Sequence, residues 1–109
     1  MNIEPARMIS AAQEASGFLQ ALGQPTRLMI LCRLAEGEMS VGKLADSLGL
    51  RQATVSQHLA LLRREGLVAT RREAQTVYYR IADERAQVLL ETLYKLFCEP
   101  TAACGSGER

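Results

Sequence analysis

Apolar residues recur every three or four positions along the first third of the chain, which is the spacing of an amphipathic helix. This spacing predicts one helix over about residues 5–22 and a second over about residues 25–36, with Gly23 between them and Pro25 in the first turn of the second. Apolar residues cover most of the circumference of the second helix, so we expect it to be central and mostly buried. Gly37 closes this helix.

The pattern from Ser40 onward predicts two further helices joined by a tight turn. Ser40 is a good N-cap for the first of them. Ala45 allows two crossed helices to approach closely, Gly49 permits a left-handed turn between them, and Val55 packs the second helix onto the first. These residues predict a helix-turn-helix unit, and Gly66 ends its second helix.

Alternating apolar and polar residues then predict two paired strands, over residues 67–72 and 76–81. A last helix follows, with Asp83 as its N-cap, an apolar stripe along one face, and Pro100 as its stop. The predicted fold is therefore mainly α with a β-hairpin wing, that is, a winged helix-turn-helix with the element order ααααββα.

The predicted first and last helices both carry strong apolar faces, and one small module cannot cover both. We therefore expect a homodimer through the terminal helices, in which each subunit contacts one half of an inverted repeat. The alternative is that both helices fold back onto the core of the monomer. The length of the chain predicts one domain over residues 1–99, followed by a flexible tail over residues 100–109.

Positive charge is concentrated in one segment although the whole chain is nearly neutral. The net charge is +1, whereas residues 51–80 contain six arginines and two glutamates. A local excess of positive charge on a near-neutral protein indicates a phosphate-binding surface. Aromatic residues make up only 5% of the chain, which argues against stacking on single-stranded nucleic acid. The partner predicted from these features is double-stranded DNA.

The second helix of the predicted helix-turn-helix turns a polar ridge away from its apolar face. Short polar side chains followed by an amide and an imidazole suit base edges in the major groove, and arginines on the hairpin suit phosphates or the minor groove. The residues expected to contact operator DNA are Gln52, Thr54, Ser56, Gln57 and His58 on the helix and Arg71, Arg72 and Gln75 on the hairpin.

Little in the chain indicates an enzyme. His58 is the only histidine, and no serine, cysteine or pair of carboxylates lies at a spacing that would complete an active site. We therefore expect no catalytic residues and no cofactor. The chain has no apolar stretch of membrane-spanning length and no signal-peptide pattern at its start, so we expect a cytoplasmic protein without a membrane partner.

The segment from Gly23 to Val68, which includes SQHLALLRREGLV, resembles the ArsR family of small dimeric bacterial repressors. The resemblance covers roughly residues 15–98 and implies a winged helix that binds operator DNA. Many members of the family sense metals, through a Cys-x-Cys on the first helix of the helix-turn-helix or through Asp and His ligands on the last helix. Here those positions are SVGKL and ADERAQVLLETLYKLF, so we reject metal sensing as the main interpretation.

Cys32 in ILCRL and Cys98 in KLFCEP resemble the cysteine pair of the SqrR/BigR/HlyU branch of this family. The resemblance implies that these two thiols sense reactive sulfur species such as persulfides, and that a polysulfide bridge between them releases operator DNA. Cys104 lies beyond the pattern of the family. A disulfide requires Cα atoms within about 7 Å, whereas a bridge with inserted sulfur atoms spans a wider gap.

Other interpretations of the two cysteines remain open on the sequence alone. The pair could form a plain disulfide in a general oxidant sensor, or Cys32 could be a small buried hydrophobe on the apolar face of its helix. A metal-sensing ArsR-type repressor is a further alternative of the same class. A thiol oxidoreductase and a winged-helix module for protein contacts are alternatives of another class.

Overall fold

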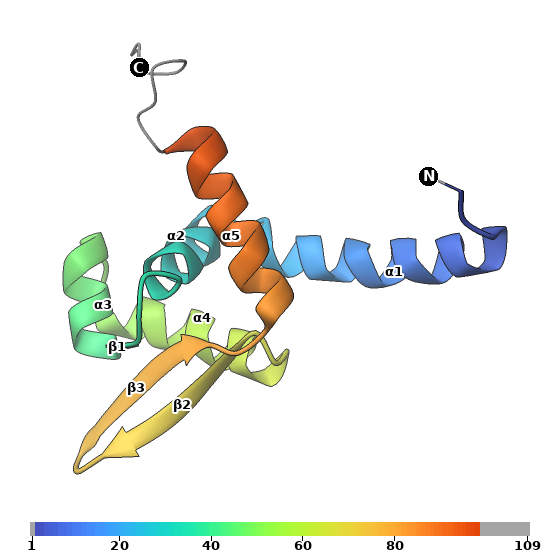
Figure 1. Cartoon of the computed structure of the whole chain (residues 1–109). Helices are drawn as coiled ribbons and strands as arrows, with labels where there is room; N and C mark the ends of the chain where they lie inside the picture. Colours follow the sequence, from blue (N-terminus) through green and yellow to red (C-terminus); the bar gives the residue numbers. More distant parts are fainter. Residues whose placement is uncertain (1, 99–109) are drawn as a thin grey trace.

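The structure is a computed structural model, and it describes residues 2–98 (Figure 1). The predicted tail over residues 100–109, the predicted stop at Pro100 and the third cysteine, Cys104, lie outside these residues. In chain order the elements are α1 (Pro5–Leu22), α2 (Pro25–Leu34), β1 (Met39–Ser40), α3 (Val41–Leu48), α4 (Gln52–Arg64), β2 (Val68–Glu73), β3 (Thr76–Ile81) and α5 (Glu84–Phe97). The predicted winged helix-turn-helix is confirmed, with β1 as an additional strand.

The caps predicted for α3 and α5 are confirmed. The Ser40 hydroxyl accepts a hydrogen bond from the Lys43 amide at 3.3 Å. A carboxylate oxygen of Asp83 accepts one from the Arg85 amide at 2.8 Å. Each cap satisfies a backbone amide that has no partner within its own helix.

Helix α2 ends at Leu34, slightly earlier than the sequence predicts. The amides of Glu36 and Gly37 donate to carbonyl oxygens three residues back, at 3.2 and 3.0 Å. This tighter hydrogen-bond pattern ends the α-helix before the glycine is reached. The segment that follows leads directly into β1.

The residues predicted to shape the helix-turn-helix lie where the two helices cross. Ala45 of α3 and Val55 of α4 are completely buried between them, at 1% and 0% exposed. Gly49 has a φ of 68°, in the left-handed region that glycine adopts without strain. The turn between α3 and α4 therefore has the geometry that the sequence predicts.

The core lies where α2, α3, α4 and the first half of α5 meet, and α2 is its central element, as predicted. Its largest completely buried side chains are those of Ile30, Leu31, Leu44, Val55, Leu59, Leu62 and Leu90. This packing fixes α4 and the wing relative to α2. None of the described helices is long and apolar enough to cross a membrane.

The wing is part of a three-stranded antiparallel sheet with the order β1-β3-β2. Strand β1 was not predicted because two residues are too few to give an alternating pattern; it pairs Met39 with Tyr79 and Ser40 with Tyr78. The turn between β2 and β3 places Ala74 at a φ of 57°. Alanine gives no turn signal, because glycine or asparagine usually occupies such a position.

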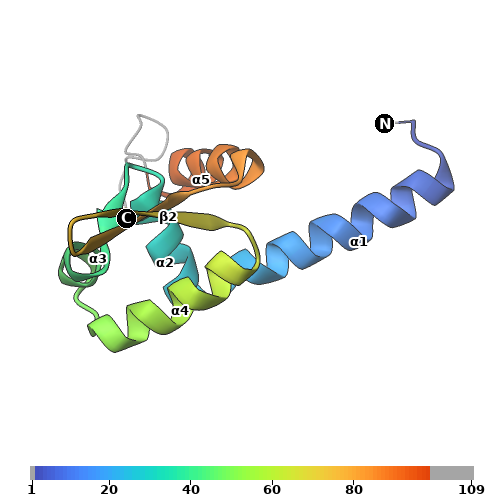
Figure 2. The same ribbon diagram turned by 90° about the horizontal axis from the view of Figure 1, so that it is seen from below.

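Helix α1 projects away from the rest of the molecule (Figure 2). Only its last two residues are buried, while Ile9 near its start is 61% exposed. The end of α5 also leaves apolar side chains in solvent, with Phe97 at 76% exposed. The other large apolar side chains exposed on these two helices are Met8, Leu19, Val88, Tyr94 and Leu96. Within residues 2–98, neither helix covers the apolar face of the other.

Candidate DNA-binding surface and dithiol site

The outward side of α4 carries most of the residues predicted to contact DNA. The inward side chains of α4, from Val55, Leu59 and Leu62, are completely buried, and this orients the opposite side toward solvent. On that outward side Gln52, Ser56 and Gln57 are exposed, and Thr54 and His58 are half-buried.

Two of these side chains are in more constrained positions than the sequence suggests. The amide nitrogen of Gln52 lies over Gly42, 3.6 Å from the place that a β-carbon would take there, so Gln52 spans the junction of α3 and α4. The Nδ1 atom of His58 is buried, and no group in residues 2–98 forms a hydrogen bond with it.

The wing presents two exposed polar side chains near its tip. Arg72 lies on β2, and Gln75 lies in the turn that leads to β3. In the part of the chain that the structure describes, Arg72 forms no ion pair. Its positive charge is therefore available to a phosphate.

Arg71, the third predicted wing residue, is bound by other side chains of the protein. Its Nε donates to both carboxylate oxygens of Glu38, at 2.8 and 3.1 Å, and its Nη1 donates to Glu73 at 3.1 Å. Its guanidinium also lies over the Tyr78 ring, 4.7 Å from the centroid. The hydrogen bond from Arg71 lowers the pKa of the Glu38 carboxyl, so Glu38 is ionised at neutral pH. The sequence prediction did not include Glu38.

The two cysteines of the predicted pair lie against one cavity between α2 and α5. Both are free thiols; Cys32 on α2 is half-buried and Cys98, directly after α5, is exposed. They line a cavity of about 460 Å³ together with Leu28, Arg33 and other side chains. The structure thus brings together two residues that are far apart in the sequence.

A second cavity, of about 610 Å³, adjoins the first at Cys32, Glu36 and Tyr94. Burial raises the pKa of the Cys32 thiol, and the negative charges of a Cys98 thiolate and of the Glu36 carboxylate raise it further. Cys32 therefore keeps its proton to higher pH than an ordinary cysteine.

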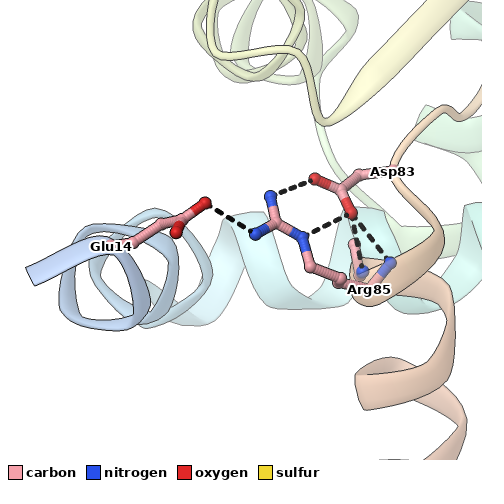
Figure 3. Close-up of polar contacts among 4 residues, drawn as sticks. Glu14, Asp83 and Arg85 are labelled. Atoms are coloured by element: carbon pink, nitrogen blue, oxygen red, sulfur yellow. Dashed lines mark hydrogen bonds and ion pairs between the residues drawn. The ribbon is translucent and has the colours of Figure 1, made fainter. Parts of the chain in front are cut away.

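A cluster of charged side chains joins the start of α5 to α1 (Figure 3). The guanidinium of Arg85 donates to Glu14 of α1 at 3.0 Å and to Asp83 at 3.0 Å. It also lies 5.2 Å from the centroid of the Phe18 ring. The sequence prediction identified Asp83 as a cap but did not include its link to α1.

The described residues provide no group of three or more His, Cys, Asp or Glu side chains that could hold a metal ion. The dithiol cavity contains two thiols and one nearby carboxylate, Glu36. The cavity therefore brings together two free thiols and one carboxylate, and α2, which carries Cys32, is also the central helix of the core.

The winged helix has an exposed polar ridge on α4, the second helix of the helix-turn-helix, and a wing that carries arginines. These features define the class of DNA-binding regulators. The family model described as bacterial regulatory protein, arsR family, matches residues 24–70. The biofilm growth-associated repressor of Agrobacterium fabrum is 48% identical over 93 residues, which cover 85% of this chain and 80% of that protein. The chain belongs to the ArsR family of bacterial regulatory proteins, and it is a transcriptional regulator rather than an enzyme.

Solved structures agree with this assignment. The transcriptional regulator HlyU from Vibrio vulnificus is 44% identical and has a TM-score of 0.84, over 88% of this chain and 100% of that chain. The homodimeric winged helix-turn-helix DNA-binding domain of a possible ArsR-family regulator from Mycobacterium bovis is 33% identical, with a TM-score of 0.70 over 88% and 89% of the two chains. This chain thus shares its fold with both of these structures.

Proposed function

We propose that this protein is a homodimeric repressor that binds operator DNA when Cys32 and Cys98 are reduced and releases it when a polysulfide bridge joins them. The observation that carries the proposal is the cavity between α2 and α5, which both thiols line. Helix α2 is also the central element of the DNA-binding core. A covalent link at this cavity therefore acts on the helix that supports the DNA-binding unit.

The chemistry starts at the exposed thiol. The Cys98 thiolate attacks the terminal sulfur of an organic persulfide, R–S–SH; the S–S bond breaks and RS⁻ leaves. The resulting Cys98–S–SH attacks the carbon-bound sulfur of a second R–S–SH and expels HS⁻. The Cys32 thiolate then attacks the middle sulfur of Cys98–S–S–S–R, expels RS⁻ and closes a trisulfide. In total, two thiols and two persulfides give one trisulfide bridge, two R–SH and one H₂S.

In the DNA-binding form, we propose that both α4 and the wing contact DNA. The side chains of α4 that we propose for base edges and nearby phosphates are Gln52, Thr54, Ser56, Gln57 and His58. Arg72 and Gln75 of the wing are proposed to contact the adjacent backbone or the minor groove. A two-fold dimer places two such surfaces about 34 Å apart, which fits an inverted repeat in double-stranded DNA.

The exposed apolar faces of α1 and α5 support dimerisation through these terminal helices. Large exposed apolar surface on a soluble protein often marks an interaction site, and both helices leave large apolar side chains exposed. The Mycobacterium bovis domain, which has the same fold, is homodimeric. We propose the same kind of assembly here.

The test is a peptide map by mass spectrometry of the reduced protein after treatment with glutathione persulfide, with Cys104→Ser present throughout. We expect a crosslink between the Cys32 and Cys98 peptides that is heavier than a disulfide by at least one sulfur atom. Unmodified cysteines would refute the proposal. A plain disulfide formed equally well by hydrogen peroxide would replace it with a general oxidant sensor.

Two serine variants test whether the bridge controls DNA. Cys32→Ser and Cys98→Ser should bind operator duplexes, selected with the reduced protein, as tightly as the parent. Persulfide should weaken binding by the parent about 5- to 150-fold, the usual range of allosteric coupling, and leave both variants unaffected. A folded variant that no longer binds operator would show that the cysteines are structural.

A further inference from the structure

The contacts of Arg71 extend across the whole sheet of the wing. Glu38 directly precedes β1, Tyr78 lies on the central strand β3, and Arg71 lies on the outer strand β2. The guanidinium crosses the Tyr78 ring and donates from two nitrogens to the Glu38 carboxylate. We call Glu38, Arg71 and Tyr78 the wing clamp. It connects the hairpin to the segment that leaves α2.

The strand register places the wing clamp on the sheet face that points away from the core. Tyr78 is paired with Arg71 on one side and with Ser40 on the other. Met39 and Tyr79, each one residue along, pack against the core. Because successive side chains of a strand point to opposite faces, the clamp lies on the outer face.

The same alternation separates the two neighbouring arginines. Arg72 is paired with Val77 and points to the face on which the core and α4 lie. Arg71 points to the opposite face. A DNA duplex that contacts the outward side of α4 therefore lies on the side of Arg72 and not on the side of Arg71.

The charge of Arg71 is compensated within the protein. Two carboxylates, from Glu38 and Glu73, bind its guanidinium. The positive charge of Arg80 also helps to lower the pKa of Glu38. Glu38 is the better covered of the two carboxylates, with its side chain 32% exposed against 66% for Glu73. Single exposed ion pairs contribute little, whereas an arginine bound through two nitrogens and stacked on a ring holds a defined geometry.

We infer that Glu38 is a positioning residue for DNA binding. Through Arg71 and Tyr78 it holds the hairpin at a fixed angle to the core, so that Arg72 and Gln75 reach the DNA backbone. Arg71 serves as the connection and does not itself contact phosphate. The inference depends on DNA binding by the wing and is independent of the chemistry of the cysteines.

The test compares Glu38→Gln, Arg71→Gln and the double variant, each in the reduced full-length protein. Glu65→Gln is the matched control, because it also removes one exposed negative charge but has no ion pair within residues 2–98. Binding to a mixed-sequence DNA duplex is titrated by fluorescence anisotropy over a series of salt concentrations. Amide hydrogen exchange of residues 72–77 in the free proteins reports on the hairpin directly.

Both single variants should weaken binding by the same factor, and the double variant should be no weaker than either. The association constant falls as salt rises, and the magnitude of the slope of its logarithm against log salt should decrease by about 0.9 for each phosphate that Arg72 no longer neutralises. Hairpin amides should exchange faster in all three variants and not in the control. The inference is overturned if Glu38→Gln binds as tightly as Glu65→Gln or more tightly. It is also overturned if Arg71→Gln lowers the slope by the same amount in the parent protein and in the Glu38→Gln variant, because Arg71 would then contact phosphate.

Discussion

At the scale of single residues, the two thiols share a cavity but differ in their surroundings. Cys98 is exposed, whereas Cys32 is half-buried and has a raised pKa. The thiolate is the species that attacks sulfur electrophiles, so a raised pKa lowers the reactivity of Cys32 at neutral pH. In the proposed mechanism we therefore expect Cys98 to react first with the persulfide and Cys32 to close the bridge.

Glu36→Gln should make Cys32 more reactive. A raised pKa means less thiolate at any given pH, so alkylation of Cys32 by iodoacetamide should rise with pH at a midpoint above that of an ordinary cysteine. Burial is the largest cause of this shift and Glu36 the smallest, so the variant should lower the midpoint only in part. Mass spectrometry of each cysteine peptide against pH measures this.

Glu91→Gln provides the matched control for that variant. Glu91 lines the larger cavity but is not among the groups that raise the pKa of Cys32. Its replacement should leave the midpoint of Cys32 unchanged. If Cys32 is alkylated before Cys98 in the parent protein, the order of attack given above is wrong.

The sequence indicated Cys32 and Cys98 as a pair only through a resemblance to a family, because no local pattern places these two residues against one cavity. It gave no sign of the partners of charged residues. Arg71 and Glu38 are 33 positions apart, and Arg85 and Glu14 are 71 apart. Such pairs depend on how distant elements pack, and each residue alone has the character of an ordinary solvated charge.

At the scale of elements, the spacing of apolar residues was sufficient to predict the helices and strands that are long enough to show a repeating pattern. Helices α1 and α4 and strand β3 are all found where the apolar spacing predicts them. Strand β1 was missed because it has two residues, and the turn type was not predicted because Ala74 occupies a glycine-like conformation. These features are set by the pairing of β3 with its neighbours rather than by local propensity.

The start of α5 illustrates an element fixed by a single side chain. Asp83 accepts hydrogen bonds from two backbone amides of α5 and binds Arg85, which in turn reaches α1. The hydrogen bond from Arg85 is the main cause that lowers the pKa of Asp83. One carboxylate thus both caps α5 and connects it with the first helix.

Asp83→Ala should lower the free energy of unfolding by about 1 kcal/mol, the usual value of an N-cap, and Asp83→Asn by less. Because the folded-state pKa of Asp83 is lowered, its contribution is complete above about pH 4 and is lost as the pH falls through that folded-state pKa. Urea unfolding at pH 7 and pH 3, at one protein concentration, measures both effects.

Two comparisons make the Asp83 experiment decisive. Asp46→Ala, at an exposed position within α3 whose side chain is not a cap, should cost little at either pH. The difference in the free energy of unfolding between the parent and Asp83→Asn should become smaller at pH 3 than at pH 7, because the asparagine does not titrate. Equal stability of the parent and Asp83→Ala at pH 7 would mean that solvent caps α5 equally well.

At the scale of the whole molecule, the cavity lies between the two surfaces that a repressor has to connect. Cys98 follows α5, whose exposed apolar face is part of the proposed dimer surface. Cys32 lies on α2, which leads through Glu38 to the sheet and the wing. A bridge across the cavity would link α2 to α5. It would thereby change the distance between the two DNA-binding surfaces of a dimer, each formed by α4 and the wing of one subunit. A coupling of about 1–3 kcal/mol, the usual allosteric range, would weaken operator binding about 5- to 150-fold.

This arrangement requires that α1 and α5 form the dimer, which Ile9→Glu and Phe97→Glu test. These side chains are 61% and 76% exposed in the single chain, so a carboxylate at either position leaves the subunit folded but buries an unpaired charge in the dimer. Sedimentation equilibrium should show the mass of two chains for the parent and of one chain for each variant, with operator affinity falling in parallel because a monomer reaches one half-site. Met29→Glu, at an exposed apolar position of α2, should keep the mass of the dimer. If both variants of the terminal helices also keep it, the subunits meet elsewhere, and Cys98 has no route to the dimer surface through α5.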